Sequence, residues 1–353
     1  MTETEAAVRA IFAEQAGWCD RLDSPFTALL CRLLGERLDR SAETGRRLLD
    51  WPGGPPTIAD AVPLRLCGGL NFLARSGADP ALAACYPPNG LPNPETLWSA
   101  VRPALDSPDL PAWLERAPQT NEVGRAAVLT SGLLVIADCF AQPVELLELG
   151  ASAGLNLLLD RYGYKLGGLM AGNPESPLQL VPEWTGPPPP KSDLRVVARC
   201  GVDIAPLDVR ADRDRLLAYV WPDQVARLEQ LEAALAIAAA DPPPVEQGDA
   251  ADWLDHRLSQ PGAPGVTRVV LHSVAFHYFP ADAQRRIAAR MAECGAGASE
   301  DSPLAWLRYE HEPGDENFSL ALRIWPGDEK WRLAESRPRA LATLVVTPQL
   351  RAR

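Results

Sequence analysis

The residues best suited to chemistry lie in one short stretch, from Glu148 to Asn156, which follows an apolar segment that begins at Val144. Small residues occupy positions 150 to 154, so the backbone there can turn sharply and approach a ligand closely. The apolar segment before the turn indicates a buried strand, and the leucine-rich segment after it indicates a helix. Two kinds of site use such a corner: a nucleotide-type cofactor site at a helix N-terminus, and a serine nucleophile.

The serine interpretation depends on Ser152, because Gly150-x-Ser152-x-Gly154 has the spacing of the nucleophile turn in α/β-hydrolases. A serine esterase of this kind also needs an acid, a later histidine and an oxyanion hole. Histidines such as His272 follow the serine, but no histidine precedes it. We expect no strand before Val144, whereas hydrolases place this turn after several strands. The esterase is therefore the less favoured alternative.

The chain after Val144 alternates between expected strands and helices, which predicts an α/β fold with a mostly parallel sheet covered on both faces. Several of the expected strands end in polar residues. Asp203 ends the segment that begins at Val196, Asp249 follows a short strand at 245–247, and His272 ends an apolar strand that begins at Thr267. These residues are the further candidates for a site at the strand ends.

The segment Glu148-Leu-Gly150-Ala-Ser152-Ala-Gly154 resembles motif I of the class I methyltransferases that use S-adenosylmethionine, with Ser152 in place of the middle glycine. In that family the turn wraps the amino-acid and sugar part of the cofactor. The resemblance implies that S-adenosylmethionine is the cofactor. It also implies that Glu148 holds the turn and the cofactor ammonium, and that Gly150, Ser152, Gly154 and Asn156 form the cradle.

The same resemblance assigns roles at the ends of the later strands. It implies that Asp203 accepts hydrogen bonds from the ribose hydroxyls and that Asp249 and Ala250 lie beside the adenine. It also places His272, at the end of the fourth strand, next to the cofactor and the reaction centre. Helix capping is the alternative role of the two aspartates. A dinucleotide-dependent dehydrogenase is less favoured, because the glycine spacing differs from G-x-G-x-x-G.

His272 and His277 are the candidates for removing a proton from a methyl acceptor, because histidine titrates near neutral pH. A packed core position is the alternative for a histidine in so apolar a strand. Glu122 and Arg125 open the apolar helix that precedes the first strand, so we expect them near its end. Arg125 could pair with the cofactor carboxylate, and Glu122 is a third catalytic candidate. Capping and a surface ion pair are the alternative for these two residues.

The chain of 353 residues is expected to form two domains. Residues 1–140 are expected to be a helical lid or acceptor-selecting domain. Residues 141–353 are expected to form a Rossmann-like class I methyltransferase domain, with α/β/α layers and an insertion at 163–195. Ser24 and Pro25 are expected to cap a helix. Helices of the first domain are expected at Ala6–Cys19, Phe26–Leu38, Leu64–Arg75 and Leu97–Leu105.

Composition restricts the partners. A formal net charge of −12 argues against general nucleic-acid binding, which needs clustered lysine and arginine. No apolar segment reaches the roughly 20 residues of a membrane span, and the acidic N-terminus lacks the layout of a signal peptide. The seven cysteines are odd in number and scattered. We therefore expect reduced thiols in a cytoplasmic protein, with no disulfide framework and no metal site.

A larger part of the chain resembles an uncharacterised bacterial family of unknown function, DUF2332. The most specific motif is Pro-Gln-Thr-Asn-Glu at 118–122, and the resemblance departs at 337–340. The other segments that carry it are 148–156, 160–162, 203–208 and 272–273. That family supplies no activity, so the expected function rests on the methyltransferase-like site. We expect a methyltransferase acting on a small-molecule acceptor, with a non-catalytic binder of S-adenosylmethionine or a nucleoside as the alternative. The acceptor and the oligomeric state do not follow from the sequence.

Overall fold

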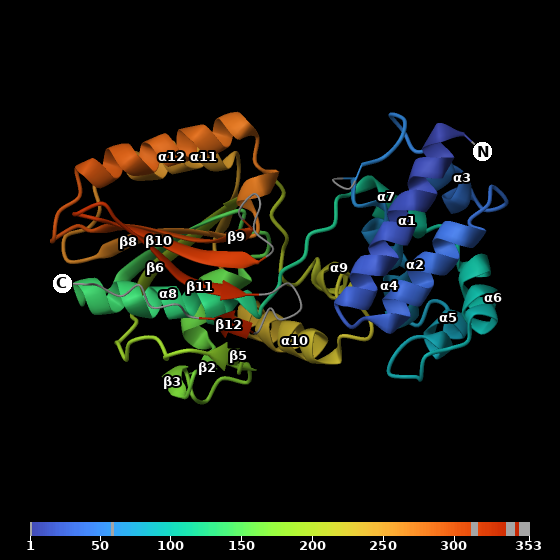
Figure 1. The fold of residues 1–353 in the computed structure, drawn as a ribbon, viewed down its shortest axis with the longest axis horizontal. Helices are drawn as coiled ribbons and strands as arrows, with labels where there is room; N and C mark the ends of the chain where they lie inside the picture. Colours follow the sequence, from blue (N-terminus) through green and yellow to red (C-terminus); the bar gives the residue numbers. More distant parts are fainter. Residues whose placement is uncertain (1, 58–59, 312–316, 337–342, 346–353) are drawn as a thin grey trace. The chain divides into compact units, whose positions relative to one another are not determined.

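A computed structural model describes residues 2–57, 60–311, 317–336 and 343–345. The chain divides into two compact units (Figure 1). The first unit comprises residues 1–120 together with 212–229, and the second comprises 121–211 and 230–353. The first division therefore falls at 120, before the expected position of 140, because the helix that follows residue 124 packs against the sheet of the second unit.

The first unit is helical, as expected. Its described helices are α1 (Glu3–Arg21), α2 (Pro25–Arg37), α3 (Glu43–Leu49), α4 (Val62–Arg75), α5 (Pro80–Cys85), α6 (Pro94–Ala104), α7 (Leu110–Glu115) and α9 (Arg213–Ala218). The four helices expected from the sequence correspond to α1, α2, α4 and α6. The sequence did not indicate α3, α5 and α7, because helices of six or seven residues are too short to show a helical period.

The start of α2 differs from the expectation. Ser24 occupies the N-cap position, but its side chain makes no capping hydrogen bond to the helix. Asp223 supplies the cap instead: its carboxylate accepts hydrogen bonds from the backbone N–H of Phe26 at 2.8 Å and from the hydroxyls of Ser24 and Thr27. A carboxylate distant in sequence therefore satisfies the free donors of this helix, which ties residues 212–229 to the helical unit.

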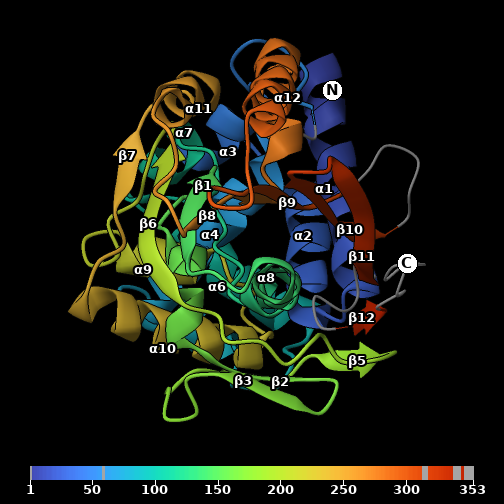
Figure 2. The same ribbon diagram turned by 90° about the vertical axis from the view of Figure 1, so that its left-hand side faces the viewer.

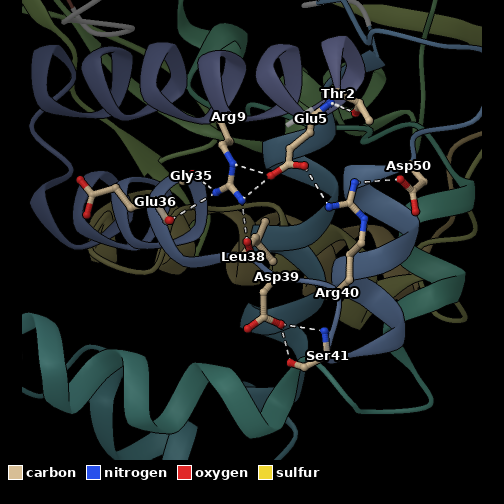
Figure 3. A network of polar contacts seen from close by, with 10 residues as sticks. All are labelled: Thr2, Glu5, Arg9, Gly35, Glu36, Leu38, Asp39, Arg40, Ser41 and Asp50. Atoms are coloured by element: carbon tan, nitrogen blue, oxygen red, sulfur yellow. Dashed lines mark hydrogen bonds and ion pairs between the residues drawn. The ribbon is translucent and has the colours of Figure 1, made fainter.

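A polar network joins α1 to the C-terminal end of α2 (Figure 3). Arg9 donates hydrogen bonds to the backbone carbonyls of Gly35 at 2.7 Å and Leu38 at 2.8 Å. These carbonyls have no partner within the helix, so the guanidinium completes the helix end. Glu5 bridges Arg9 and Arg40, and hydrogen bonds from both guanidinium groups lower the pKa of this carboxyl.

The second unit has an α/β fold with a mixed, mostly parallel sheet, which confirms the expected fold class. Nine strands of the described residues form this sheet in the order β5-β12-β11-β10-β9-β8-β1-β6-β7. The strands β7, β6, β1, β8 and β9 run parallel to one another, and β10, β11 and β12 follow as antiparallel neighbours. Their bounds are β1 (Val144–Leu149), β5 (Glu183–Thr185), β6 (Val196–Asp203), β7 (Val245–Gln247), β8 (Thr267–Ser273), β9 (Leu304–His311), β10 (Phe318–Trp325), β11 (Glu329–Ser336) and β12 (Thr343–Val345).

Helices cover both faces of this sheet (Figure 2). The helix α8 (Arg125–Phe140) lies on one face, and α11 (Ala250–Ser259) and α12 (Ala281–Ala296) lie on the other. Gly132 of α8 allows a close approach, because a Cβ atom there would lie 2.6 Å from a methyl group of Leu307 on β9. Residues 213–240 contain two helices, α9 and α10 (Val225–Ala240), and Trp221-Pro222 lies between them.

The insertion expected at 163–195 contains a small second sheet. The hairpin β2 (Gly163–Leu166) and β3 (Leu169–Gly172) is antiparallel, and β4 (Gln179–Leu180) pairs with β2. Two buried tyrosines attach this sheet to the 3-10 helix at Leu155–Arg161, which takes the place of the helix expected after the turn. The hydroxyl of Tyr162 donates to the carbonyl of Leu155 at 2.7 Å, and the hydroxyl of Tyr164 donates to that of Leu159 at 2.6 Å.

None of the helices formed by the described residues is long and apolar enough to span a membrane. No group of three or more histidine, cysteine or acidic side chains among these residues is arranged to hold a metal ion. All seven cysteines fall within the described ranges and are free thiols.

Candidate functional site

The backbone N–H groups of the turn after β1 donate hydrogen bonds to acceptors within the protein. Gly150, Ser152 and Gly154 all have positive φ angles, of 71°, 52° and 72°. The N–H groups of Gly150 and Ala151 donate to the carbonyl of Val202, and that of Ser152 donates to the carboxylate of Asp203 at 2.8 Å. A turn that holds phosphates leaves such donors free for the ligand. The hydrogen bonding therefore argues against a diphosphate-containing ligand at this corner.

Gly150 also lies against the loop that follows β8. A Cβ atom on Gly150 would lie 2.7 Å from the Cβ of Ala275, so the two loops are in contact. We predict that Gly150→Ala destabilises the protein by about 2–4 kcal/mol, because left-handed strain adds to overpacking. Urea unfolding measures this loss. Gly168→Ala is the matched control, since Gly168 has a φ of 95° but nothing within 4 Å of its Cβ position. Equal losses in the two variants would contradict the contact between the loops.

Glu148 is the most unusual side chain of the corner. It is 2% exposed, and its Oε1 accepts a hydrogen bond from the amide of Asn156 at 3.1 Å. Its Oε2 is buried and has no hydrogen-bond partner among the described residues. Burial raises the pKa of Glu148 to about 8, although the Asn156 hydrogen bond and the charge of Arg125 oppose this. A carboxyl group in this state is mostly protonated at neutral pH and becomes ionised when a cation is supplied.

Asn156 and Arg125 connect Glu148 to the end of β8. The Asn156 amide lies 3.4 Å from the hydroxyl of Ser273, and Arg125 donates to the backbone carbonyl of Ser273 at 3.0 Å. The structure thus brings Arg125, Asn156 and Glu148 together, as the sequence predicted. Glu122 is buried, and its carboxylate accepts a hydrogen bond from the N–H of Gly124 at 3.1 Å, at the start of α8. This contact is made to the N-cap residue of α8, a helix without a side-chain cap.

The two aspartates have different surroundings. Asp203 belongs to the corner, because its two oxygens accept hydrogen bonds from the N–H groups of Ser152 and Ala205. Asp249 is the N-cap of α11 and accepts from the N–H groups of Ala251 at 2.9 Å and Asp252 at 3.0 Å. Ala250 is the first residue of that helix. Asp249 therefore has the capping contacts that were the alternative to a ligand contact.

Glu148 and His272 lie on opposite faces of the sheet. Glu148 pairs directly with Leu271, and directly paired residues of neighbouring strands share a face. His272 follows Leu271 and therefore points the other way. Its side chain is 0% exposed and stacks on Phe276, with ring centroids 4.7 Å apart. His272 thus occupies the packed core position that was the alternative to a catalytic one.

The positions of Ser152 and His272 bear on the esterase alternative. The hydroxyl oxygen of Ser152 is buried and has no hydrogen-bond partner among the described residues. Nδ1 of His272 lies 2.7 Å from Oε1 of Glu310 on β9. A serine nucleophile needs a base within hydrogen-bond reach. No such contact joins Ser152 to a histidine of the described chain, so this geometry does not favour an esterase.

Glu310 was missed in the sequence. Its Oε1 accepts hydrogen bonds from His272 and from the N–H groups of Ala275 and Phe276, both at 3.1 Å. Nδ1 of His277 lies 3.5 Å from its Oε2. Burial alone would raise the pKa of Glu310, but the contacts with the two histidines and the backbone outweigh it and hold this pKa well below its usual range. One feature of the sequence could have indicated Glu310: like the other acidic candidates, it lies near the end of a parallel strand, here the fifth.

Unsatisfied polar atoms gather at the carboxyl ends of β1, β8 and β9. Buried atoms with no hydrogen-bond partner among the described residues include Oε2 of Glu148, Oγ of Ser152, Nε2 of His272 and Oε2 of Glu310. Such atoms are rare in folded proteins. The loop after β8 also contains Val274 with a φ of 50°, a strained value for a β-branched residue. We call the turn 148–156, Asp203 and the loop 273–279 the strand-end site.

Comparison with known proteins identifies the family. The chain belongs to a family of uncharacterised proteins conserved in bacteria, DUF2332, whose family model matches residues 9–342. The match includes every residue of the strand-end site and confirms the resemblance seen in the sequence. No curated protein matches the chain.

Proposed function

We propose that this DUF2332 protein binds S-adenosylmethionine at the strand-end site and transfers its methyl group to a small-molecule acceptor. The main observation in support of this proposal is the state of the Glu148 side chain. A buried carboxyl group with a raised pKa and one oxygen without a partner is poised to receive a cation. The ammonium group of the cofactor is such a cation, and it would restore the ionised form of Glu148 in a charge-assisted hydrogen bond.

The strand order supports a nucleoside ligand at this place. The five parallel strands lie in the order β7-β6-β1-β8-β9, which by chain position is third, second, first, fourth and fifth. In doubly wound sheets of this order, ligands bind at the carboxyl ends of the strands, where the order reverses between the first and the fourth. Glu148 is the penultimate residue of the first of these strands, and Ser273 is the last residue of the fourth. One feature departs from a standard doubly wound sheet: β10 pairs with β9 as an antiparallel neighbour.

The residues of the site fit the parts of the cofactor unequally. Glu148 would hold the ammonium, and Arg125, whose charge acts on Glu148, would be near the carboxylate. Asp203, whose two carboxylate oxygens accept backbone N–H groups of the turn and of the segment after β6, would receive a ribose hydroxyl. The cofactor supplies an activated methyl group when bound. The protein would contribute binding, alignment of the acceptor and exclusion of water.

Thermal unfolding with three ligands tests the proposal. S-adenosylmethionine and S-adenosylhomocysteine should both raise the melting temperature, whereas 5′-methylthioadenosine, which lacks the ammonium and the carboxylate, should raise it much less at equal concentration. Equal shifts with all three ligands would indicate a nucleoside binder that does not use Glu148. A ligand concentration of about 1 mM is high enough to detect a binding free energy of about −4 kcal/mol. The proposal fails if none of the three ligands changes the melting temperature at this concentration.

A further inference from the structure

Glu310 organises the loop after β8. Its Oε1 accepts from His272 on the strand and from two backbone N–H groups at the start of the loop, and its Oε2 faces His277 at the far end of the loop. A single carboxylate, with a side chain only 9% exposed, therefore holds His272 and the loop backbone by hydrogen bonds through Oε1, while its Oε2 lies at ion-pair distance from His277. Such a contact set is typical of a carboxylate that orients an imidazole.

The two histidines differ in access. His272 is fully buried between Phe276 and Trp306, so it cannot contact an acceptor without repacking of the core. His277 has a side chain that is 44% exposed. Because Nδ1 of His277 faces Glu310, its Nε2 lies on the opposite side of the ring. The exposed ring of Tyr278 lies beside it, with centroids 3.8 Å apart.

The loop that carries His277 is in contact with the turn that carries Glu148. The Cβ position of Gly150 meets Ala275 at 2.7 Å and the ring of Phe279 at 3.5 Å. A ligand held by the turn after β1 would therefore have the loop after β8 as its neighbour. The imidazole of His277, the ring of Tyr278 and the turn after β1 therefore lie at the same edge of the sheet.

We propose that His277 is the base that removes the proton from the methyl acceptor, and that Glu310 is the positioning residue that orients it. This inference rests on the proposed function and deepens it, because a base is needed only when the reacting atom carries a proton. The acceptor is therefore an O–H or N–H compound, and the exposed ring of Tyr278 favours one with an apolar or aromatic body.

The proposed step is balanced in atoms and electrons. A lone pair of the acceptor oxygen or nitrogen forms a bond to the methyl carbon, and the carbon–sulfur bond breaks with its electron pair going to sulfur. The acceptor proton passes to Nε2 of His277. The products are the methylated acceptor, S-adenosylhomocysteine and a protonated imidazole, whose charge the Glu310 carboxylate stabilises before the proton is released to water.

Nitrogen NMR of the four histidines tests the pair without any assay of activity. In the wild-type protein, His277 should carry its proton on Nδ1, toward Glu310, and leave Nε2 as the basic nitrogen. In Glu310→Gln, this tautomer preference should be lost. The glutamine can still accept the backbone N–H groups of Ala275 and Phe276, so the loop is expected to remain in place. An Nε2–H tautomer in the wild-type protein, or no change in Glu310→Gln, would overturn the positioning role.

Transfer of a labelled methyl group from S-adenosylmethionine to a bacterial metabolite extract tests the catalytic role. His277→Gln should lower transfer at pH 7 by at least ~100-fold, and the loss should shrink as pH rises and the acceptor ionises unaided. His311→Gln is the control, because His311 is an exposed histidine of β9 whose ring packs against Phe318. Binding of S-adenosylhomocysteine should change less than ~3-fold in either variant, well within 1 kcal/mol.

The outcomes separate this inference from the proposed function. If the wild-type protein binds no S-adenosylhomocysteine, the proposed function fails, and the catalytic role of His277 fails with it. If binding is normal but His277→Gln transfers methyl groups as fast as the wild-type protein, only the role of His277 is overturned. Normal binding with no transfer by the wild-type protein to any compound of the extract would also overturn it and favour a non-catalytic binder.

Discussion

Glu148→Gln is expected to lower the affinity for S-adenosylhomocysteine by at least ~100-fold, because losing one partner of a buried charged pair costs about 2–5 kcal/mol. Glutamine keeps the size of the side chain and its ability to accept the hydrogen bond of Asn156, so the change is confined to the charge. Titration calorimetry measures the affinity. Glu175→Gln, at an exposed residue of the insertion, is the matched control and should bind like the wild-type protein.

The same variant is expected to be more stable than the wild-type protein at high pH. The pKa of Glu148 is raised from 4.5 to about 8 on folding, so the stability linked to its protonated form is present below pH 4.5 and is lost as pH rises to about 8. Glutamine does not titrate. The unfolding free energy of the variant relative to wild type should therefore increase with pH through this window, by several kcal/mol and at most ~5.

Urea unfolding at pH 5, 7 and 9 measures this dependence. A difference between Glu148→Gln and wild type that is independent of pH would show that Glu148 is ionised in the ligand-free protein at all three values. The site would then lack the buried neutral carboxyl on which the proposed cation binding depends. A rise in relative stability together with a loss of affinity is the combination expected of a residue kept for binding at the expense of stability.

The second large effect is proton release on binding. Glu148 is mostly protonated at pH 7 when its pKa is about 8, and it must ionise to pair with an ammonium group. Binding of S-adenosylhomocysteine at pH 7 should therefore release about one proton, and the affinity should rise nearly tenfold per pH unit between pH 5 and pH 7.

Calorimetry in two buffers with different heats of ionisation measures the number of protons released. Glu148→Gln supplies the control, because its weaker binding should be almost independent of buffer and of pH in the same range. Uptake of a proton, or a wild-type affinity that does not change between pH 5 and pH 7, would contradict the role of Glu148 as the group that pairs with the ammonium.

Much of the fold and part of the site could be predicted from the sequence. Long apolar strands and helices of ten or more residues carry clear periodicity, so β1, β6 and β8 and the main helices lie near their expected positions. The carboxyl ends of parallel strands and the helix ends beside them also converge, which explains why Glu148 and Asp203 lie near Asn156 and Arg125.

The remaining features depend on information that one segment does not contain. The side of the sheet to which a residue near a strand end points follows from its pairing register. This separates His272 from Glu148, although each is the penultimate residue of its strand and the two strands are neighbours. The role of Glu310 depends on a partner on another strand, 38 positions away. The strand β11 was missed because its residues are mostly polar and partly exposed. Residues 212–229 join the helical unit through Asp223 and other contacts distant in sequence.

The most direct test of the account is a calorimetric titration of the wild-type protein with S-adenosylhomocysteine at pH 7. The proposed function predicts saturable binding of one ligand per chain with a Kd well below ~1 mM. A Kd of that size corresponds to a binding free energy of about −4 kcal/mol. Absence of heat up to ~1 mM, at two temperatures, would contradict the claim that the strand-end site holds this cofactor.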